Sequence, residues 1–294
     1  MKKCLITGAT GLIGAQLRQA LPQDWQVFAV ARSPLIATQR QPATQIALDL
    51  STDWNPAALP PQIDAIIHLA QSENFREFPD RALDIFQVNT LSTLRLLDYA
   101  RQAGAQTFIL ASSGGVYGHH EQVLSEDEAL TAKVDLGFYA GTKLCAEILA
   151  ENYTAYMNMI MARFFFVYGA EQRKSMLIPR LVQSVLEGRT MTLQGQDGIR
   201  INPTHVADAA DALVRMLALQ GSHKINVGGP EVLSMRQIGE TIGQVIGRTP
   251  QFVVQPDVQP RHLVGDIQKM TRLLGAPQVK FAAGIQQLLA QEKA

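Results

Sequence analysis

The chain has 294 residues, 47% of them hydrophobic, which is enough to build one large domain or two smaller ones. Lysine plus arginine and aspartate plus glutamate number 26 each, so no strong field exists to hold nucleic acid or an anionic membrane. We therefore expect small molecules and copies of the same chain as partners. Cys4 and Cys145 have neither metal-ligand spacing nor a disulfide framework. This spacing predicts no bound metal. No run approaches the roughly 20 apolar residues of a membrane-spanning helix, so a cytoplasmic protein is predicted.

Short apolar runs alternate with longer helical patterns in the first part of the chain. Strands are predicted at Lys3–Thr7, Gln26–Ala31, Ala65–Leu69, Thr107–Ser112 and Met159–Phe165. Helices are predicted at Leu12–Leu21, Leu83–Ala103 and Tyr139–Met157. Continuous apolar strands separated by helices are typical of a parallel sheet buried on both faces. The fold class predicted is therefore α/β, with a doubly wound parallel sheet of the Rossmann type.

A glycine-rich segment lies between the first predicted strand and the first predicted helix. Residues 7–14 read Thr-Gly-Ala-Thr-Gly-Leu-Ile-Gly. In a strand–turn–helix, such glycines permit a tight turn and let the backbone approach a pyrophosphate, which the helix N-terminus attracts. We therefore predict that a dinucleotide contacts Gly8, Thr10, Gly11, Leu12, Ile13 and Gly14.

The end of the second predicted strand bears on which dinucleotide binds. Folds of this kind that use NAD carry an acidic residue there for the ribose 2′-hydroxyl, whereas this chain has Arg32. A guanidinium makes charge-assisted hydrogen bonds to a 2′-phosphate; the alternative is a solvated surface arginine. The predicted cofactor is NAD(P), and Arg32 favours NADP(H).

The pattern loosens after residue 170. Predicted helices at Ile178–Gly188, Val206–Gln220, Ser234–Gly247 and Gly284–Gln291 are separated by short strands and by turns with proline or glycine. We expect residues 1–170 to form an NAD(P)-binding Rossmann domain to which roughly residues 204–228 return. Residues 171–294 are expected to form a smaller substrate-binding domain.

Tyr139 and Lys143 are four residues apart in a predicted helix, so they share one face. A phenol with a pKa near 10 is a weak base at neutral pH. A neighbouring ammonium and an oxidised nicotinamide ring both favour the phenolate, which brings its pKa toward the working range. The pair therefore fits proton transfer, although the spacing alone also occurs on ordinary helix faces.

Further motifs follow in order along the chain. They are Leu48-Asp49-Leu50, Ile67-His68-Leu69-Ala70, Val88-Asn89-Thr90, residues 111–118 (Ala-Ser-Ser-Gly-Gly-Val-Tyr-Gly), residues 163–169 (Arg-Phe-Phe-Phe-Val-Tyr-Gly), Val206-Ala207-Asp208, residues 226–229 (Asn-Val-Gly-Gly) and residues 266–269 (Asp-Ile-Gln-Lys). With the glycine loop and the Tyr–Lys pair, they resemble the extended short-chain dehydrogenases/reductases of the NAD-dependent epimerase/dehydratase family. The resemblance covers nearly the whole chain and implies chemistry on a secondary alcohol or ketone.

The resemblance also implies residue roles. Ser113 corresponds to the residue that hydrogen-bonds the reacting oxygen, Tyr139 to the acid/base, and Lys143 to the residue that binds the nicotinamide ribose and lowers the tyrosine pKa. The other positions assigned to the cofactor are Asp49, near the adenine, and Leu50, Leu69, Ala70 and Asn89. Asn89 also corresponds to an asparagine that supports the lysine or the proton path. His68 is expected to be a packing residue, because a histidine at a strand end is more often structural than catalytic.

The chain departs from the family at the positions that bind substrate phosphates. Phe166 stands where relatives often have asparagine, and Ile201 where they often have arginine. Arg200 is one step away along a strand, which turns a side chain to the other face. Arg261 lies closer to the Asp-x-x-Lys motif than the corresponding arginine. A substrate smaller or less charged than a nucleotide sugar is thus an alternative.

Gly114 and Gly115 stand where sugar-nucleotide 4,6-dehydratases carry Asp-Glu, so elimination lacks an acid and a base, and a dehydratase is excluded. The expected function is nucleotide-sugar epimerisation. The alternatives are an NADPH-dependent reductase of a keto-sugar or other small ketone, and a non-catalytic NADP(H) sensor; an intact catalytic set argues against the sensor. The helices predicted at 83–103 and 139–157 resemble those that form a dimer interface in relatives, so we expect a homodimer.

Overall fold

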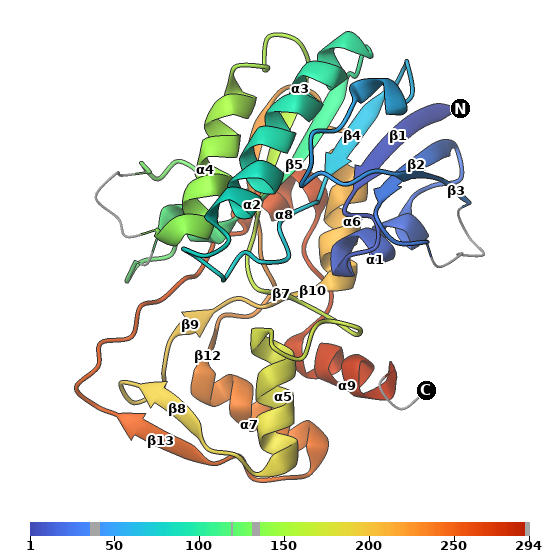
Figure 1. Ribbon diagram of the computed structural model, residues 1–294. Helices are drawn as coiled ribbons and strands as arrows, with labels where there is room; N and C mark the ends of the chain where they lie inside the picture. Colours follow the sequence, from blue (N-terminus) through green and yellow to red (C-terminus); the bar gives the residue numbers. More distant parts are fainter. Residues whose placement is uncertain (36–41, 119, 131–135, 292–294) are drawn as a thin grey trace. The chain divides into compact units, whose positions relative to one another are not determined.

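The computed structural model describes residues 1–35, 42–118, 120–130 and 136–291, and the chain forms two compact units (Figure 1). Unit 1 comprises residues 1–116, 135–163 and 210–225, and unit 2 comprises residues 117–134, 164–209 and 226–294. Among the helices of the described residues, none has the length and apolar content needed to cross a membrane.

A seven-stranded sheet, most of it in unit 1, has the order β11–β6–β5–β4–β1–β2–β3. Parallel pairs join β1 to β2 and β4, β2 to β3, and β4 to β5. The strands are β1 (Lys2–Thr7), β2 (Trp25–Ala31), β3 (Ala43–Ala47), β4 (Ala65–His68), β5 (Thr107–Ser113), β6 (Asn158–Phe164) and β11 (His223–Val227). The strand order reverses at β1, and in such sheets ligands bind outside the carboxyl ends of the strands at this point. The doubly wound sheet predicted from the sequence is confirmed.

Helices cover both faces of this sheet (Figure 1). They are α1 (Leu12–Ala20), α2 (Ala82–Phe86), α3 (Ser92–Gln102), α4 (Gly137–Glu151) and α6 (Val206–Met216). Leu96 and Leu97 of α3 and Ala146 of α4 are fully buried in one core cluster with Phe108 of β5. This packing fixes α4, which carries the Tyr–Lys pair, against the sheet.

Two predicted helices differ from those of the structure. The helix predicted at 83–103 is divided, because a π-helical turn, η2 (Gln87–Leu91), separates α2 from α3. The helix predicted at 139–157 ends at Glu151, where the Asn152 amide donates to the carbonyl of Ile148 and satisfies one of its last acceptors. Strand β3 was not predicted because its polar residues lie exposed at the sheet edge.

Unit 2 packs helices against short strand pairs. Its helices are α5 (Leu177–Glu187), α7 (Met235–Ile246), α8 (Gln268–Leu274) and α9 (Phe281–Gln291). The pairs are β7 (Val167–Tyr168) with β10 (Thr204–His205), β9 (Arg200–Ile201) with β12 (Leu233–Ser234), and β8 (Met191–Gln194) with β13 (Phe252–Gln255). Ser234 and Gln237 form a capping box at the start of α7. The unit has its own core, which includes Ile178, Val182, Ile238, Ile242 and Ile285.

Candidate active site

The glycine loop is closed so tightly that side chains do not fit. Gly8 has φ +67°, and a Cβ there would lie 2.8 Å from the Ala70 nitrogen and 2.9 Å from the Leu69 carbonyl carbon. A Cβ on Gly14 would lie 2.2 Å from the Gly8 oxygen. The loop between β1 and α1 therefore packs directly on the backbone that follows β4, which is the close approach that a dinucleotide-binding turn requires.

The start of α1 offers backbone donors at this loop. No side chain caps the helix, and no acidic residue occupies its first turn. Helix N-termini carry unpaired N–H groups and a partial positive charge, which suits a pyrophosphate. Buried Arg18 supports the loop from inside, since its Nε donates to the carbonyl of Ala9 at 3.1 Å. The exposed or half-buried residues at this helix start are Thr10, Gly11, Leu12 and Ile13.

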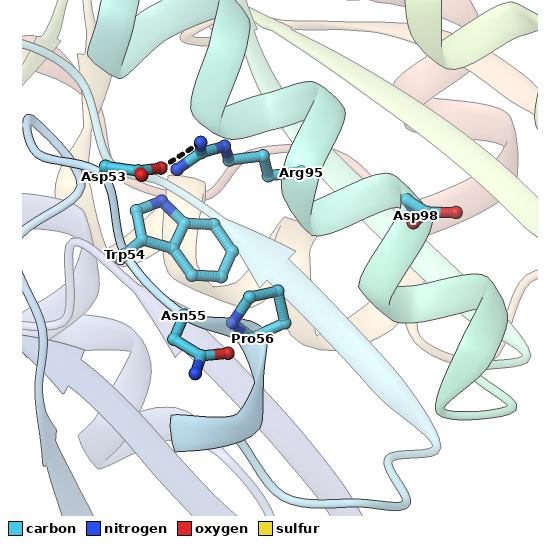
Figure 2. Close-up of a pocket in the computed structure, with 6 residues that line it drawn as sticks. All are labelled: Asp53, Trp54, Asn55, Pro56, Arg95 and Asp98. Atoms are coloured by element: carbon cyan, nitrogen blue, oxygen red, sulfur yellow. Dashed lines mark hydrogen bonds and ion pairs between the residues drawn. The ribbon is translucent and has the colours of Figure 1, made fainter.

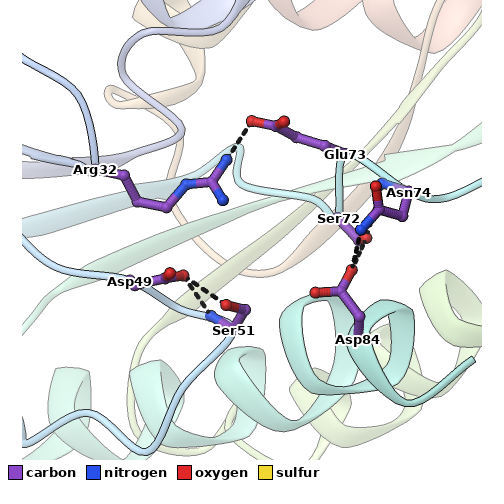
Figure 3. A network of polar contacts seen from close by, with 7 residues as sticks. All are labelled: Arg32, Asp49, Ser51, Ser72, Glu73, Asn74 and Asp84. Atoms are coloured by element: carbon purple, nitrogen blue, oxygen red, sulfur yellow. Dashed lines mark hydrogen bonds and ion pairs between the residues drawn. The ribbon is translucent and has the colours of Figure 1, made fainter. Parts of the chain in front are cut away.

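Arg32 follows β2 and forms an ion pair with Glu73 of the loop after β4 (Figure 3). Asp49, after β3, accepts hydrogen bonds from the Ser51 nitrogen at 2.9 Å and hydroxyl at 2.8 Å. Burial alone would raise the pKa of Asp49, but these two bonds and the Arg32 charge outweigh it and lower the pKa. Leu50 is buried in the core cluster of unit 1. Arg32 is thus exposed enough to meet a ligand, but it already has a carboxylate partner.

His68 joins β1, β4 and α3 through an uncharged network. Its Nδ1 lies 2.6 Å from Thr7 Oγ1, and its Nε2 lies 3.0 Å from Thr93 Oγ1. The Thr93 hydroxyl donates to the carbonyl of Asn89, so the proton of His68 must be on Nε2. Burial, with the Lys143 charge, lowers the pKa of His68 to about 3. The neutral, fully paired ring agrees with a structural role.

Asn89 lies in the π-helical turn and is 1% exposed. Its Oδ1 accepts from the Ser72 nitrogen at 2.9 Å, and its Nδ2 donates to Thr142 Oγ1 at 3.1 Å. Thr142 in turn donates to the carbonyl of Tyr139. Asn89 therefore ties the loop after β4 to the helix that carries Tyr139. π-helical turns inside helices are often found at functional sites.

Ser113 ends β5, and Tyr139 lies in the first turn of α4. The Ser113 hydroxyl accepts from the Gly115 nitrogen at 3.1 Å. Tyr139 donates its hydroxyl proton to Gln71 Oε1 at 2.9 Å, and its ring centroid lies 5.1 Å from that of Phe75. Burial raises the pKa of Tyr139 to about 12, although a hydrogen bond with Ser113 acts in the opposite direction. The structure thus brings Ser113 and Tyr139 together, as the resemblance implies.

Lys143 is 3% exposed, one turn after Tyr139, and its Nζ donates to the carbonyl of Ala111 at 3.0 Å. Burial lowers the pKa of Lys143 to about 8, and the charge of Glu147 partly offsets this effect. An ammonium that is only weakly solvated in this way is well suited to act on a nearby phenol and on ribose hydroxyls.

Glu147 and Arg163 form a buried pair that sequence reasoning did not identify. Their side chains are 2% and 1% exposed, with Nε–Oε1 and Nη2–Oε2 distances of 3.0 and 2.7 Å. The pair joins α4 to β6. Its signals in the sequence were an arginine inside an apolar strand and a glutamate one helical turn after Lys143.

In unit 2, packed apolar side chains occupy the two positions, 166 and 201, at which the resemblance implied phosphate-binding residues. Phe166 has φ +44°, a region that bulky side chains rarely adopt, and packs against the core of the unit. Ile201 is fully buried, whereas neighbouring Arg200 is exposed. The prediction that Arg200 faces away from the Ile201 side is therefore confirmed.

A separate depression of about 400 Å³ lies on unit 1 (Figure 2). The Arg95 guanidinium lies over the Trp54 ring at 5.9 Å and forms an ion pair with Asp53. No residue predicted for the site lines this depression, whose walls are Asp53, Trp54, Asn55, Pro56, Arg95 and Asp98.

Comparisons with known proteins agree on one family. The model of the NAD dependent epimerase/dehydratase family matches residues 4–228. The chain is 28% identical over 92% of its length to an uncharacterized UDP-glucose epimerase, YtcB, of Bacillus subtilis, of which 92% is covered. A UDP-glucuronic acid 4-epimerase of Bacillus cereus, in complex with UDP-glucuronic acid and NAD, superposes with a TM-score of 0.85 at 26% identity, with 99% of each chain covered. MoeE5, in complex with UDP-glucuronic acid and NAD, gives 0.84 at 28% identity, again with 99% of each chain covered.

Proposed function

Because the chain belongs to the NAD dependent epimerase/dehydratase family, we propose that it is a nucleotide-sugar epimerase that inverts one secondary alcohol carbon. The observation that carries the proposal is the arrangement of Ser113, Tyr139 and Lys143 at the end of β5 and the start of α4. The similar UDP-glucuronic acid 4-epimerase and the MoeE5 structure hold a UDP-sugar and NAD. These relatives support a nucleotide sugar as substrate and the sugar C4 as the reacting carbon.

The described residues fit a dinucleotide. The turn at Gly8 and Gly14 leaves no room for side chains, and the uncapped start of α1 offers backbone donors to the pyrophosphate. A bound dinucleotide would supply the hydride acceptor for the alcohol carbon and the hydride donor for the ketone. We assign the cofactor contacts to Gly8, Thr10, Gly11, Leu12, Ile13, Gly14, Arg32, Asp49, Leu50, Leu69, Ala70, Asn89, Tyr139 and Lys143.

The protein side chains move the proton. Tyr139 as phenolate takes the hydroxyl proton of the substrate, and as phenol it returns a proton to the ketone oxygen. The Ser113 hydroxyl donates to the same oxygen and holds it beside Tyr139. Lys143 in its ammonium form favours the phenolate, because an opposite charge nearby lowers the pKa of a phenol. Gly114 and Gly115 supply no carboxylate that could serve as the acid or base of an elimination.

The choice between NAD and NADP depends on the pair of Arg32 and Glu73. A 2′-phosphate gains a charge-assisted partner only if Arg32 leaves Glu73, and the Glu73 carboxylate opposes a second anion there. Both side chains are about half exposed, so the pair itself is weak. We infer that Arg32 favours NADP(H) and that Glu73 limits this preference.

The homodimer expected from the sequence also remains a proposal, which exposed apolar residues support. Helices α2, α3 and α4 carry Leu83, Phe86, Leu94 and Ile148, which are 36–87% exposed. Large exposed apolar side chains on neighbouring helices are typical of an interface. We propose that these helices pair with the same helices of a second copy.

Turnover without added cofactor tests the proposed function. An epimerase consumes in its second half-reaction the reduced cofactor formed in the first, so it needs no net supply. We expect the purified protein to interconvert the C4 epimers of at least one sugar in a panel of UDP-, TDP- and GDP-sugars. Common UDP-hexoses should react slowly, since Phe166 and Ile201 offer no side-chain donor to a diphosphate. Turnover that occurs only with stoichiometric consumption of NADPH would instead identify a ketone reductase.

A further inference from the structure

Gln71 occupies the hydrogen-bonding position that the reacting oxygen of the substrate would need. It is exposed, yet its Oε1 lies 2.9 Å from the Tyr139 hydroxyl and accepts the only proton that this hydroxyl can donate. A substrate oxygen that is to exchange a proton with Tyr139 must come within the same distance. Gln71 and the substrate therefore compete for one group.

The residues that follow Gln71 are held by polar contacts, some of which Figure 3 shows for Ser72 and Glu73. The Ser72 nitrogen donates to Asn89 Oδ1, and the Ser72 hydroxyl is hydrogen-bonded to Asp84 of α2. Glu73 is ion-paired with Arg32. The loop after β4 is thus attached to the η2 turn, to α2 and to the end of β2, so the backbone that carries Gln71 is held beside Tyr139.

We propose that Gln71 is a positioning residue that holds Tyr139 protonated and oriented until the substrate displaces its amide. An acceptor at this distance stabilises the phenol over the phenolate, which accepts but cannot donate. A substrate hydroxyl that replaces the amide oxygen of Gln71 can donate to the phenolate as well as accept from the phenol, so the one-sided stabilisation of the phenol ends. Tyr139 then releases its proton to solvent before it takes the one from the substrate hydroxyl. The inference rests on the proposed role of Tyr139.

Other groups near Tyr139 do not account for this effect. The hydrogen bond with Ser113 of β5 lowers the pKa of Tyr139, and an ammonium at Lys143 on the same helix acts in the same direction. Two charged side chains of the loop after β4 and of α2 have partners of their own: Arg76 lies over the Phe75 ring at 5.1 Å, and Asp84 is hydrogen-bonded to Ser72. Burial also favours the neutral phenol, since it raises the pKa of Tyr139. Among the side chains hydrogen-bonded to the Tyr139 hydroxyl, Gln71 is the one that accepts its proton.

Two substitutions of the exposed Gln71 should shift the phenol–phenolate equilibrium of Tyr139 in opposite directions. Gln71→Ala removes the acceptor and admits water, which can donate to a phenolate, so the pKa of Tyr139 should fall. Gln71→Glu places a carboxylate beside the hydroxyl, so the pKa should rise. The net free energy of one hydrogen bond corresponds to a decrease in the pKa of Tyr139 of about half a unit to one unit in the alanine variant.

The measurement is a near-ultraviolet phenolate titration of the protein with saturating NAD⁺, with Tyr139→Phe as the spectral blank. Gln102→Ala is the matched control, because Gln102 is an exposed glutamine of α3 whose amide donates to Asp98. The pH dependence of turnover should shift in the same direction as each titration, while the control leaves both unchanged. Unaltered titrations, or shifts of the same sign in both Gln71 variants, overturn the proposal. Because the titration needs no substrate, it can fail while the loss of turnover in Tyr139→Phe still supports the proposed function.

Discussion

Replacing Glu147 by glutamine tests how α4, the helix that carries Tyr139 and Lys143, is held to the sheet. The substitution removes one charge of a pair whose side chains are 1–2% exposed and leaves Arg163 buried without its partner. Breaking a buried pair on one side costs about 3–5 kcal/mol, whereas replacing both members by apolar residues is often neutral. We therefore expect Glu147→Gln to lose about 3–5 kcal/mol of unfolding free energy. The double variant Glu147→Leu/Arg163→Met should recover most of it.

The assay is equilibrium urea unfolding of the two single variants, the double variant and the unaltered protein, followed by circular dichroism. A double-mutant cycle isolates the pairwise term. Single-variant losses below about 1 kcal/mol, or a double variant as unstable as the two losses added together, would refute the view that α4 depends on this pair.

The double variant also separates stability from catalysis. The charge of Glu147 raises the pKa of Lys143 against the effect of burial, so its removal should lower that pKa below about 8. Since the unfolded lysine titrates near 10.5, the unfolded state binds more protons between the two values. Stability therefore rises with pH across this window. In the double variant this rise in stability should begin at a lower pH than in the unaltered protein. As the pH is raised, the loss of turnover that accompanies deprotonation of Lys143 should also begin at a lower pH.

Four further outcomes are expected. Tyr139→Phe should retain dinucleotide binding by calorimetry but lose about 10²–10⁴-fold in turnover; near-normal turnover would contradict its role. Arg32→Ala should weaken NADP(H) about ten- to a hundredfold and leave NAD(H) nearly unchanged, while Glu73→Gln should tighten NADP(H) by roughly two- to fivefold; equal effects on both cofactors would make Arg32 an ordinary surface residue. Ile148→Glu should convert a dimer to a monomer in light scattering at unchanged helical content, and an unaltered mass would exclude α4 from the interface. Phe166→Asn should unfold at higher urea than Phe166→Ala, because asparagine tolerates positive φ; the reverse order would show that the backbone there is not strained.

The sequence predicted the parts of the fold that depend on local pattern. The apolar strands, the glycine turn and the i, i+4 spacing of Tyr139 and Lys143 each follow from a repeat or a conformational need, and the structure places them as expected. The π-helical turn was not predictable, because one additional residue in a helix alters the period by less than ordinary sequence variation does. Asn89 lies in this turn and is buried.

Contacts between segments far apart in the sequence could not be predicted either. Glu147 and Arg163 lie on different elements, and only the packed structure shows that each charge compensates the other. The same applies to Gln71, which follows β4 in the sequence and is hydrogen-bonded to Tyr139 of α4 only in the packed structure. Leu50, assigned to the cofactor by resemblance, has its side chain in the core, so its assignment depends on its backbone alone.

The strand order of the main sheet also constrains how the protein is made. Strand β6 is complete at residue 164, but its outer neighbour β11 begins only at residue 223. On the ribosome, the outer edge of β6 has no strand to pair with while residues 165–222 are synthesised. Unpaired strand edges readily pair with other chains. Expression at reduced temperature, or with chaperones that shield nascent strands, should therefore improve the soluble yield more than substitutions in the finished fold would.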